Sequence, residues 1–430
     1  MLKMSKENAI KKIESSQYDA IMKKIYFTDS EVAKQKERYK KILDLFCEYY
    51  NADREIRFFS APGRTEVCGN HTDHNKGKVM AAAVNLDIVA AAGKNEEDIV
   101  RVKSAEYDKI DEIDINDLVP HEEEYGRSKG LIRGICAGFK NRGYSIGGFD
   151  AATMTQVLSG SGLSSSAAFE VLVGTCMNYL YNDGKVSAVE IAQIAQYAEN
   201  VFFDKPCGLM DQMACSVGGF VKIDFADTDK PVIEPVDFDF ASCGHNLCIV
   251  DTRANHADLT DEYGFIRQEM EKAASCFGKS VLREVDESEF KANLALVREK
   301  AGDRSVLRGL HFYGENNRVE KAAAALEKND FEEFKSVIID SGFSSYMYNQ
   351  NVFSAKQPLS QPVALALAAS DSVLRGKGAW RVHGGGFAGT IQAFVPSDML
   401  ETYRNTLESI FGEGSCYVLN VRPIGGTEIS

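Results

Sequence analysis

Residues 157–168 (VLSGSGLSSSAA) restrict the fold most, because they join a strand-like run to a helix through glycines and small hydroxyl residues. Glycine lets the backbone approach a ligand closely and adopt positive φ. The following helix offers unpaired N–H groups and the positive end of its dipole, which together suit a phosphate. A flexible Gly/Ser turn with a serine helix cap explains the pattern equally well. The pattern is neither a Walker A loop nor a dinucleotide-binding GxGxxG followed by an acid.

A second stretch, residues 61–77 (APGRTEVCGNHTDHNKG), places many short polar side chains after a predicted strand. Sugar hydroxyls require such a set of hydrogen-bonding groups. A polar surface loop explains residues 75 and 76 well. It explains Arg64 poorly, because strand alternation puts Arg64 on the same face as Glu66 and Cys68.

Two further segments have the composition of a site. Residues 382–395 (VHGGGFAGTIQAFV) place glycines between two apolar runs, which by itself favours a hairpin over a ligand site. Residues 206–212 (PCGLMDQ) follow a predicted helix that contains Glu199 near its end. Asp211 stands early in the next helix, where the dipole keeps a carboxylate ionised and able to accept a proton. Helix capping is the commoner use of an Asp in this place.

The composition excludes several classes of protein. The chain has 430 residues with 49 Lys+Arg and 63 Asp+Glu, which gives a net charge of −14 and argues against a nucleic-acid partner. No apolar run reaches the roughly 18 residues of a membrane span, and the first residues lack the apolar core of a signal peptide. The 10 cysteines are scattered without zinc spacing. We therefore expect free, mostly buried thiols in a cytoplasmic protein.

Hydrophobic periodicity predicts mixed α and β structure. We divide the chain into a helical extension (1–50), a first domain (51–235) and a second domain (236–430). Strands are predicted at 56–61, 79–93, 98–104, 149–157, 219–225, 245–251, 378–382, 387–395 and 415–421. Helices are predicted at 30–50, 164–181, 187–203, 261–277, 317–328, 331–339, 360–370 and 398–411, and a shorter one near 208.

Local signals refine this division. Ser30 is the expected cap of the helix at 30–50, and Ser187 with Glu190 forms a capping box. The acidic stretch 108–124 is expected to be a solvated surface segment. In the second half, helices are expected to cover one face of a mostly antiparallel sheet.

In this order, the motifs resemble those of the GHMP kinase superfamily, and of galactokinases in particular. The family's GRVNLIGEHTDYNGG corresponds to GRTEVCGNHTDHNKG here, and its PLGAGLSSSAALEV to LSGSGLSSSAAFEV. Its PCGIMDQ corresponds to residues 206–212, and its TGGGFGGC to HGGGFAGT at 383–390. The resemblance implies an α+β, two-domain GHMP kinase fold. Its N-terminal domain is a ribosomal-protein-S5-like α/β domain, and its C-terminal domain is a ferredoxin-like α/β sandwich.

The resemblance also implies a site between the domains that uses ATP and Mg²⁺. Asp211 is then the acid that accepts the proton of the sugar's anomeric hydroxyl, while Arg64 holds that carboxylate and stabilises the transferring phosphoryl group. The implied Mg²⁺ ligands are Ser166 and Glu199. The implied phosphate-binding residues are Gly160, Ser161, Gly162, Leu163, Ser164 and Ser165. The implied sugar-binding residues are Asn70, His71, Asp73, Gly208 and Tyr263.

Three of the departures from the family pattern concern polar residues near the predicted sugar site. Asn70 stands where galactokinases have a Glu that binds the sugar's C6 hydroxyl. An amide still hydrogen-bonds a hydroxyl, but it does not repel a carboxylate. Uronate kinases of the superfamily also have a neutral residue there and read HxDH, as His74 does here. Glu66 replaces an Asn, and we expect it to pair with Arg64.

The resemblance therefore predicts a kinase that makes galactose 1-phosphate and ADP, with galacturonate or another galactose-like sugar as the alternative substrate. A non-catalytic sugar sensor is the alternative of another class, since galactokinase-like regulators exist in yeast. Those regulators lack part of the Ser-Ser-Ala-Ala stretch, which is intact here at 165–168. The expected partners are a small sugar and ATP, with no nucleic acid and no membrane. The expected assembly is a monomer or a weak homo-oligomer.

Overall fold

The computed structural model describes residues 6–157, 162–228, 230–254 and 260–430. Its larger sheet has eight strands along the path β12-β1-β2-β5-β3-β4, with β6 paired to β2 and β7 paired to β6. All of these pairings are antiparallel except that of β3 with β5. The strands are β1 (Arg57–Cys68), β2 (Lys78–Lys94), β3 (Ile99–Ser104), β4 (Ile110–Asp114), β5 (Phe149–Thr155), β6 (Phe220–Asp224), β7 (Val232–Val236) and β12 (Thr427–Ile429).

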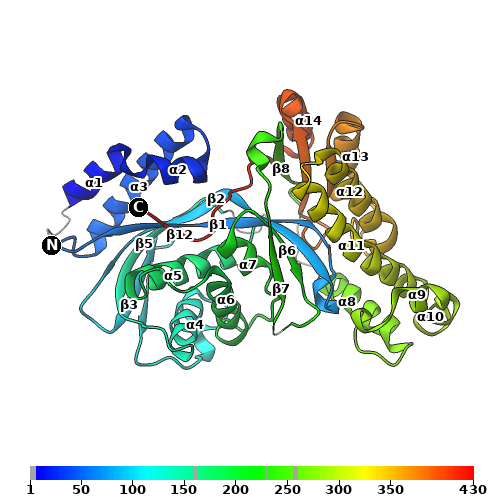
Figure 1. Ribbon diagram of the computed structural model, residues 1–430, viewed down its shortest axis with the longest axis horizontal. Helices are drawn as coiled ribbons and strands as arrows, with labels where there is room; N and C mark the ends of the chain where they lie inside the picture. The colour runs from blue at the N-terminus through cyan, green and yellow to red at the C-terminus, as the bar shows by residue number, and fades with distance from the viewer. Residues whose placement is uncertain (1–5, 158–161, 229, 255–259) are drawn as a thin grey trace.

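The long strand β2 shows how this sheet is covered on both faces. Successive residues of a strand point to opposite faces. Ala90 and Ala92 accordingly pack with the helices that follow β3, whereas Val89 and Ala91 pack with the N-terminal helices. In Figure 1 the N-terminal helices lie above the sheet and the later ones below it. The helices are α1 (Lys6–Glu14), α2 (Asp19–Tyr26), α3 (Asp29–Tyr49), α4 (Ser128–Asn141), α5 (Ser165–Tyr181), α6 (Ala188–Val201) and α7 (Met210–Val217).

Asp87 of β2 joins the N-terminal helices to the sheet. Its carboxylate is fully buried and accepts hydrogen bonds from Tyr26 Oη at 2.7 Å and Arg38 Nη1 at 2.5 Å. Arg422 Nη1, from the end of the chain, lies 3.3 Å from Asp87 Oδ2, and the Ser60 hydroxyl also donates to it. Burial by itself would raise the pKa of Asp87, but the two guanidinium groups hold it below its usual value. The helical extension is therefore an integral part of the first unit.

The second sheet is four-stranded and antiparallel, in the order β11-β8-β10-β9. Its strands are β8 (His245–Asp251), β9 (Ala379–His383), β10 (Thr390–Pro396) and β11 (Cys416–Leu419). The helices of this half are α8 (Thr260–Ser275), α9 (Glu287–Ala292), α10 (Leu294–Ala301), α11 (Asp303–Glu327), α12 (Phe331–Ser344), α13 (Pro362–Leu374) and α14 (Leu400–Phe411).

Both faces of the second sheet are covered, so the prediction of helices on one face was wrong. Cys248 and Val250 pack with α13 and α14, whereas Leu247 and Ile249 pack with α12 and with the first unit. The cause is visible in β8 itself, where all four residues from 247 to 250 are buried. A strand that is buried on both faces is apolar throughout rather than alternating.

Several local predictions are corrected by the structure. The helix at 30–50 begins at Asp29, and its cap is Thr28, whose hydroxyl accepts from the Glu31 N–H at 3.2 Å, so Ser30 is not the cap. The acidic stretch 108–124 contains the edge strand β4, in which Ile113 is buried. Helices α4, α9 and α10 were not predicted. The capping box at Ser187 is confirmed.

The chain crosses between the sheets twice. The predicted division at residue 236 falls at the end of β7, and β8 then starts the second sheet. After β11 the chain returns, and β12 pairs with β1 so that Ile429 faces Phe58. The sequence division did not include this return.

The cysteines, all of which lie in the described ranges, form no disulfide bond in the structure. All 10 are free thiols, as predicted, and most of them are buried. Across the ranges described above, no helix combines the length and the apolar character needed to cross a membrane.

Candidate active site

Arg64 and Asp211 form the centre of the candidate site. Arg64 follows an irregularity in the pairing of β1 with β2, and Asp211 lies in the first turn of α7. The guanidinium donates two hydrogen bonds to the carboxylate, from Nε to Oδ1 at 2.7 Å and from Nη2 to Oδ2 at 2.6 Å. The side chains are 11% and 32% exposed, so a substrate can reach the pair. Such a bidentate contact fixes the direction of the carboxylate.

The end of the glycine-rich turn lies against this pair. Leu163 O accepts from the Arg64 N–H at 3.0 Å, and Arg64 Nη1 donates to Gly162 O. Gly162 has a φ of +75°, which brings its carbonyl to the guanidinium without a side chain in the way. The predicted phosphate-binding turn and the predicted catalytic Arg are therefore adjacent. Of the predicted residues, Gly160 and Ser161 lie outside the described part of the chain.

Ser164 links the turn to the catalytic acid. It stands directly before α5, which begins at Ser165, and its hydroxyl donates to Asp211 Oδ2. Loss of hydration by itself would raise the pKa of Asp211, but Arg64 and then Ser164 hold it below its usual value. Asp211 is therefore ionised at neutral pH. The sequence placed Ser164 among the phosphate-binding residues and did not predict its contact with Asp211.

Ser166 and Glu199, the predicted metal ligands, lie together beside this centre. Ser166 Oγ donates to Glu199 Oε1 at 3.4 Å. Glu199 also accepts from Lys205 Nζ and from Gln212 Nε2, both at 2.6 Å. Gln212 Nε2 lies 3.1 Å from the buried carboxylate of Glu170. The sequence analysis missed Lys205 and Gln212, although Gln212 directly follows the predicted catalytic acid.

These donors fit Mg²⁺ that arrives with a nucleotide. Mg²⁺ takes oxygen ligands, keeps several waters, and is usually held by one or two carboxylates and substrate phosphates. Ser166 and Glu199 offer a hydroxyl and a carboxylate, and Glu170 Oε1 is buried with no partner among the described residues. The described ranges contain no group of three or more His, Cys, Asp or Glu side chains that could hold a metal unaided.

The glycine-rich hairpin between β9 and β10 also borders the site, because a Cβ added to Gly162 would lie 3.1 Å from Nδ1 of His383, where the hairpin starts. It is a hairpin, as its pattern predicted, and its carbonyls bind predicted sugar-site residues. His71 Nε2 lies 2.9 Å from Gly385 O, and Tyr263 Oη donates to Gly386 O at 3.0 Å. Gly386 has a φ of +81°, and a Cβ there would lie 2.0 Å from Asn351 O. Only glycine fits at this position.

Asp73 and Gly208 lie between the hairpin and the catalytic pair. A Cβ added to Gly208 would lie 3.2 Å from Asp73 Oδ2, so the backbone before α7 runs close to this carboxylate. Burial raises the pKa of Asp73, an effect that His71 opposes and the negative charge of Asp211 reinforces. The structure therefore brings His71 and Tyr263 to the hairpin, and Gly208 to Asp73, which feels the charge of Asp211.

Helix α11 fixes the backbone at residues 69–71. Glu315 Oε2 accepts from the N–H groups of Gly69 at 2.8 Å and Asn70 at 3.2 Å. Burial by itself would raise the pKa of Glu315, but Arg318 and other charges lower it to about 2. Burial lowers the pKa of His311 to about 4, so a neutral imidazole contacts Asn70 O at 2.9 Å.

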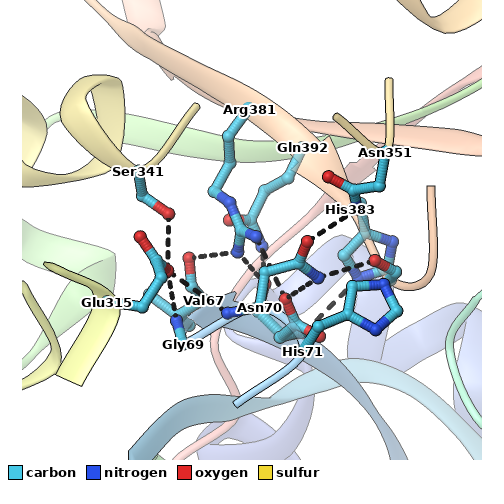
Figure 2. Close-up of polar contacts among 12 residues, drawn as sticks. Val67, Gly69, Asn70, His71, Glu315, Ser341, Asn351, Arg381, His383 and Gln392 are labelled. Atoms are coloured by element: carbon cyan, nitrogen blue, oxygen red, sulfur yellow. Dashed lines mark hydrogen bonds and ion pairs between the residues drawn. The ribbon is translucent and has the colours of Figure 1, made fainter. Parts of the chain in front are cut away.

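Asn70 lies inside a polar network that joins the two sheets (Figure 2). Its Nδ2 donates to Glu66 Oε1 at 2.9 Å and to Gly384 O at 2.8 Å. Its Oδ1 accepts from Asn351 Nδ2 at 2.8 Å. Because the residue is only 1% exposed, the protein itself uses the amide. The predicted contact of Asn70 with the sugar's C6 hydroxyl stays a prediction.

Glu66 pairs with Arg381 rather than with Arg64, which corrects the sequence expectation. Glu66 Oε1 lies 3.0 Å from Nη2 of the fully buried Arg381, which comes from β9. Arg64 forms its ion pair with Asp211 instead. No local pattern indicates Arg381 as the partner, because 314 residues separate it from Val67, whose carbonyl it also binds at 2.8 Å.

The family pattern has Asn at position 66 and Glu at position 70, whereas this chain has Glu66 and Asn70. This exchange leads to a stability prediction. Asn70→Glu alone places two carboxylates against each other and removes two donated hydrogen bonds, so we expect it to lower the free energy of unfolding by about 3 kcal/mol. Adding Glu66→Asn removes the repulsion and should recover at least half of that loss. Urea unfolding of the two single variants and the double variant measures the coupling. Strictly additive effects would contradict the pairing.

Comparison with known proteins agrees with this arrangement. The galactokinase galactose-binding signature matches residues 44–94, and the N-terminal domain of GHMP kinases matches residues 130–219. The chain is 32% identical over 372 residues to the galactokinase of Streptomyces coelicolor, covering 85% of this chain and 91% of that protein. It is also 32% identical over 349 residues to the galactokinase of Glaesserella parasuis, covering 81% and 87%.

Solved structures extend the likeness to the fold. Lactococcus lactis galactokinase complexed with galactose matches with a TM-score of 0.73 at 25% identity, covering 89% of this chain and 98% of that chain. Methanococcus jannaschii mevalonate kinase matches with a TM-score of 0.60 at 12% identity, covering 85% and 98%, which shows the fold alone. The chain is therefore a sugar kinase with the GHMP kinase fold, and it belongs to the galactokinase family.

Proposed function

We propose that this sugar kinase transfers the terminal phosphoryl group of ATP to the anomeric C1 hydroxyl of galactose or a galactose-like sugar. The products are the sugar 1-phosphate and ADP. The proposal rests chiefly on the Arg64–Asp211 pair, which contacts the glycine-rich turn through Gly162 and lies within electrostatic reach of Asp73, a predicted sugar residue. The similarity to a galactokinase structure complexed with galactose supports the choice of sugar.

In this proposal Asp211 is the base that receives the proton of the C1 hydroxyl. Its Oδ2 accepts from both Arg64 and Ser164, whereas its Oδ1 accepts only from Arg64 among the described residues. Each carboxylate oxygen has two lone pairs, so Oδ1 keeps one for the hydroxyl. An ionised carboxylate at hydrogen-bond distance makes the hydroxyl oxygen more nucleophilic as the phosphoryl group is transferred.

Charge neutralisation is the second contribution of the chain. Phosphoryl transfer depends mainly on positioning and on stabilising negative charge around the transferring group. Arg64 keeps its positive charge beside the glycine-rich turn, and Lys205 brings a second cation to Glu199. Mg²⁺ bound with ATP would neutralise further phosphate charge, and Ser166 with Glu199 are the residues that would hold it.

Replacing Glu199 with Gln tests the metal assignment. Removing the charge should raise the Mg²⁺ concentration needed for half-maximal activity by at least about tenfold. The measurement is initial velocity against free Mg²⁺ at saturating ATP and sugar. Glu190→Gln, at the other end of α6, is the matched control and should leave this dependence unchanged. An unchanged Mg²⁺ dependence in Glu199→Gln would reject Glu199 as a ligand.

The proposed function is tested by ADP release with Mg-ATP and a panel of sugars. The panel contains galactose, galacturonate, N-acetylgalactosamine, arabinose and glucose. We expect turnover with a galactose-configured sugar and a product whose phosphate is on C1, as ³¹P and ¹H NMR can show. Sugar binding without any ADP release would contradict the proposal and support a sensor.

A further inference from the structure

Three buried side chains near the sugar side of the site carry polar atoms without partners. They are Arg308, Asn349 and Asn351, here called the Arg308 cluster, and all three are fully buried. In Arg308, Nε donates to Asn349 O at 3.2 Å and Nη1 to Glu269 Oε2 at 2.7 Å. Nη2 of Arg308, both amide atoms of Asn349 and Oδ1 of Asn351 have no hydrogen-bond partner in the described parts of the chain.

This cluster adjoins the segment predicted to bind sugar. Asn351 Nδ2 donates to Asn70 Oδ1 at 2.8 Å and to Gly385 O at 3.1 Å, and the same Gly385 carbonyl contacts His71. One turn along α11 from Arg308, His311 contacts Asn70 O at 2.9 Å. The π-helical turn at Ser345–Asn349, which supplies Asn349, packs on α11. Such π turns occur often at functional sites.

His74 connects the cluster to the same segment. Its Nε2 is buried without a partner among the described residues, and its ring lies 6.0 Å from that of His71. Burial lowers the pKa of His74 well below its usual value, and the positive charge of Arg308 lowers it further. His74 is therefore a neutral hydrogen-bonding group within electrostatic reach of Arg308.

The charge of Arg308 is only partly compensated by the protein. Its carboxylate partner, Glu269, is shared with Arg304, which contacts it through Nε at 2.8 Å and through Nη2 at 2.5 Å. Burial lowers the pKa of Arg308 to about 10; the charge of Arg304 adds to the shift, and Glu269 and Glu262 oppose it without cancelling it. A buried cation in this state is stabilised by an additional negative charge.

We propose that Arg308 and Asn349 form a binding subsite for a carboxylate group next to the sugar. Arg308 and Asn349 are held side by side by the contact of Nε with Asn349 O at 3.2 Å, and a planar carboxylate has the two acceptor oxygens that their unpartnered Nη2 and Nδ2 donors need. It brings one negative charge, whereas a phosphate would bring nearly two into a fully buried site. The carboxylate belongs either to the substrate, as in galacturonate, which carries it at C6, or to a free small acid. The proposal rests on the proposed sugar kinase function.

The test compares the sugars in the intact protein and in Asn349→Asp. This variant keeps the shape of the side chain and gives Arg308 an internal carboxylate, so it folds without a ligand. For a substrate carboxylate we expect the KM of the wild type to be about 10- to 100-fold lower for galacturonate than for galactose. Asn349→Asp should abolish this difference and leave the KM for galactose unchanged. The control is Asn317→Asp, an exposed residue on α11, the helix that carries Arg308. It adds the same charge and should change neither KM.

Potassium acetate added to the galactose reaction tests the second source. If the ligand is a free acid, acetate lowers the KM for galactose in the wild type and not in Asn349→Asp. Equal KM values for galacturonate and galactose, together with no effect of acetate, would overturn the proposed subsite. Water alone would then satisfy its donors. The proposed subsite would also be overturned if Asn349→Asp raised the KM for galactose and for galacturonate by the same factor.

Calorimetric titration without ATP separates this proposal from the proposed function. Galacturonate should bind the wild type and lose at least about tenfold in affinity in Asn349→Asp. If that loss is observed while no sugar supports ADP release, the kinase proposal fails and the subsite stands. If ADP is released but the titration shows no loss, the subsite fails and the kinase proposal stands.

Discussion

Asp211→Asn is expected to lower kcat by about 10²- to 10⁴-fold while ATP and sugar still bind, because a positioned general base contributes roughly that factor. The amide keeps the shape of the side chain but cannot accept the proton of the C1 hydroxyl. It also turns one of the Arg64 contacts at 2.6–2.7 Å into a clash of donors. The measurement is steady-state ADP release, with calorimetry for the two ligands.

The pKa of Asp211 makes this variant informative. Because Arg64 and Ser164 hold the pKa of Asp211 below its usual value, the wild-type carboxylate is ionised at the assay pH. The variant therefore differs from the wild type by one full charge. Asp204→Asn, exposed on the loop between α6 and α7, is the matched control and should keep wild-type kcat. Turnover retained in Asp211→Asn would reject the role of Asp211 as base.

Asp87→Ala is expected to lower the free energy of unfolding by about 3–5 kcal/mol, since removing one partner leaves buried charges uncompensated. The substitution leaves the guanidinium groups of Arg38 and Arg422 buried without the carboxylate that they share, with side chains 7% and 0% exposed. It also removes the acceptor of Tyr26 Oη, which stands at 2.7 Å in the folded protein. Urea unfolding followed by circular dichroism measures the change.

An exposed ion pair gives the control for this experiment. Lys6 and Asp44 are 2.7 Å apart with side chains 44% and 62% exposed. Exposed pairs contribute at most about 1 kcal/mol, so the urea midpoint of Asp44→Ala should lie close to that of the wild type. Equal midpoints for Asp87→Ala and Asp44→Ala would mean that the N-terminal helices are not held through Asp87.

The sequence predicted the parts of the site that are local in the chain. A strand, a glycine-rich turn and a helix start follow one another within residues 149–181, and the structure contains them as β5 and α5 with Gly162 at positive φ. Local rules are sufficient here, because glycine content and hydrophobic period act over a few residues. The same holds for the capping box at Ser187 and for the hairpin at 383–390.

The sequence failed where burial came from partners distant in the chain. The acidic stretch at 108–124 is mostly exposed, as expected, but its edge strand β4 was not predicted: β4 pairs with β3, and its Ile113 is buried in the main core. The second sheet is covered on both faces because the first unit packs on one of them. In β8 the uninterrupted apolar run at 247–250 is typical of a strand buried on both faces, but it does not say which distant elements cover the sheet.

By itself, then, the sequence determined which segments carry the chemistry, because motifs such as GRTEVCGNHTDHNKG and PCGLMDQ are continuous. The resemblance already implied that Arg64 holds Asp211, whereas only the tertiary structure decided that Glu66 meets Arg381. The tertiary structure brings Arg64 to Asp211 across 147 residues and Arg381 to Glu66 across 315 residues. The physical reason is that a buried charge needs a partner within hydrogen-bond distance, and only the packing of the two sheets settles which partner is there.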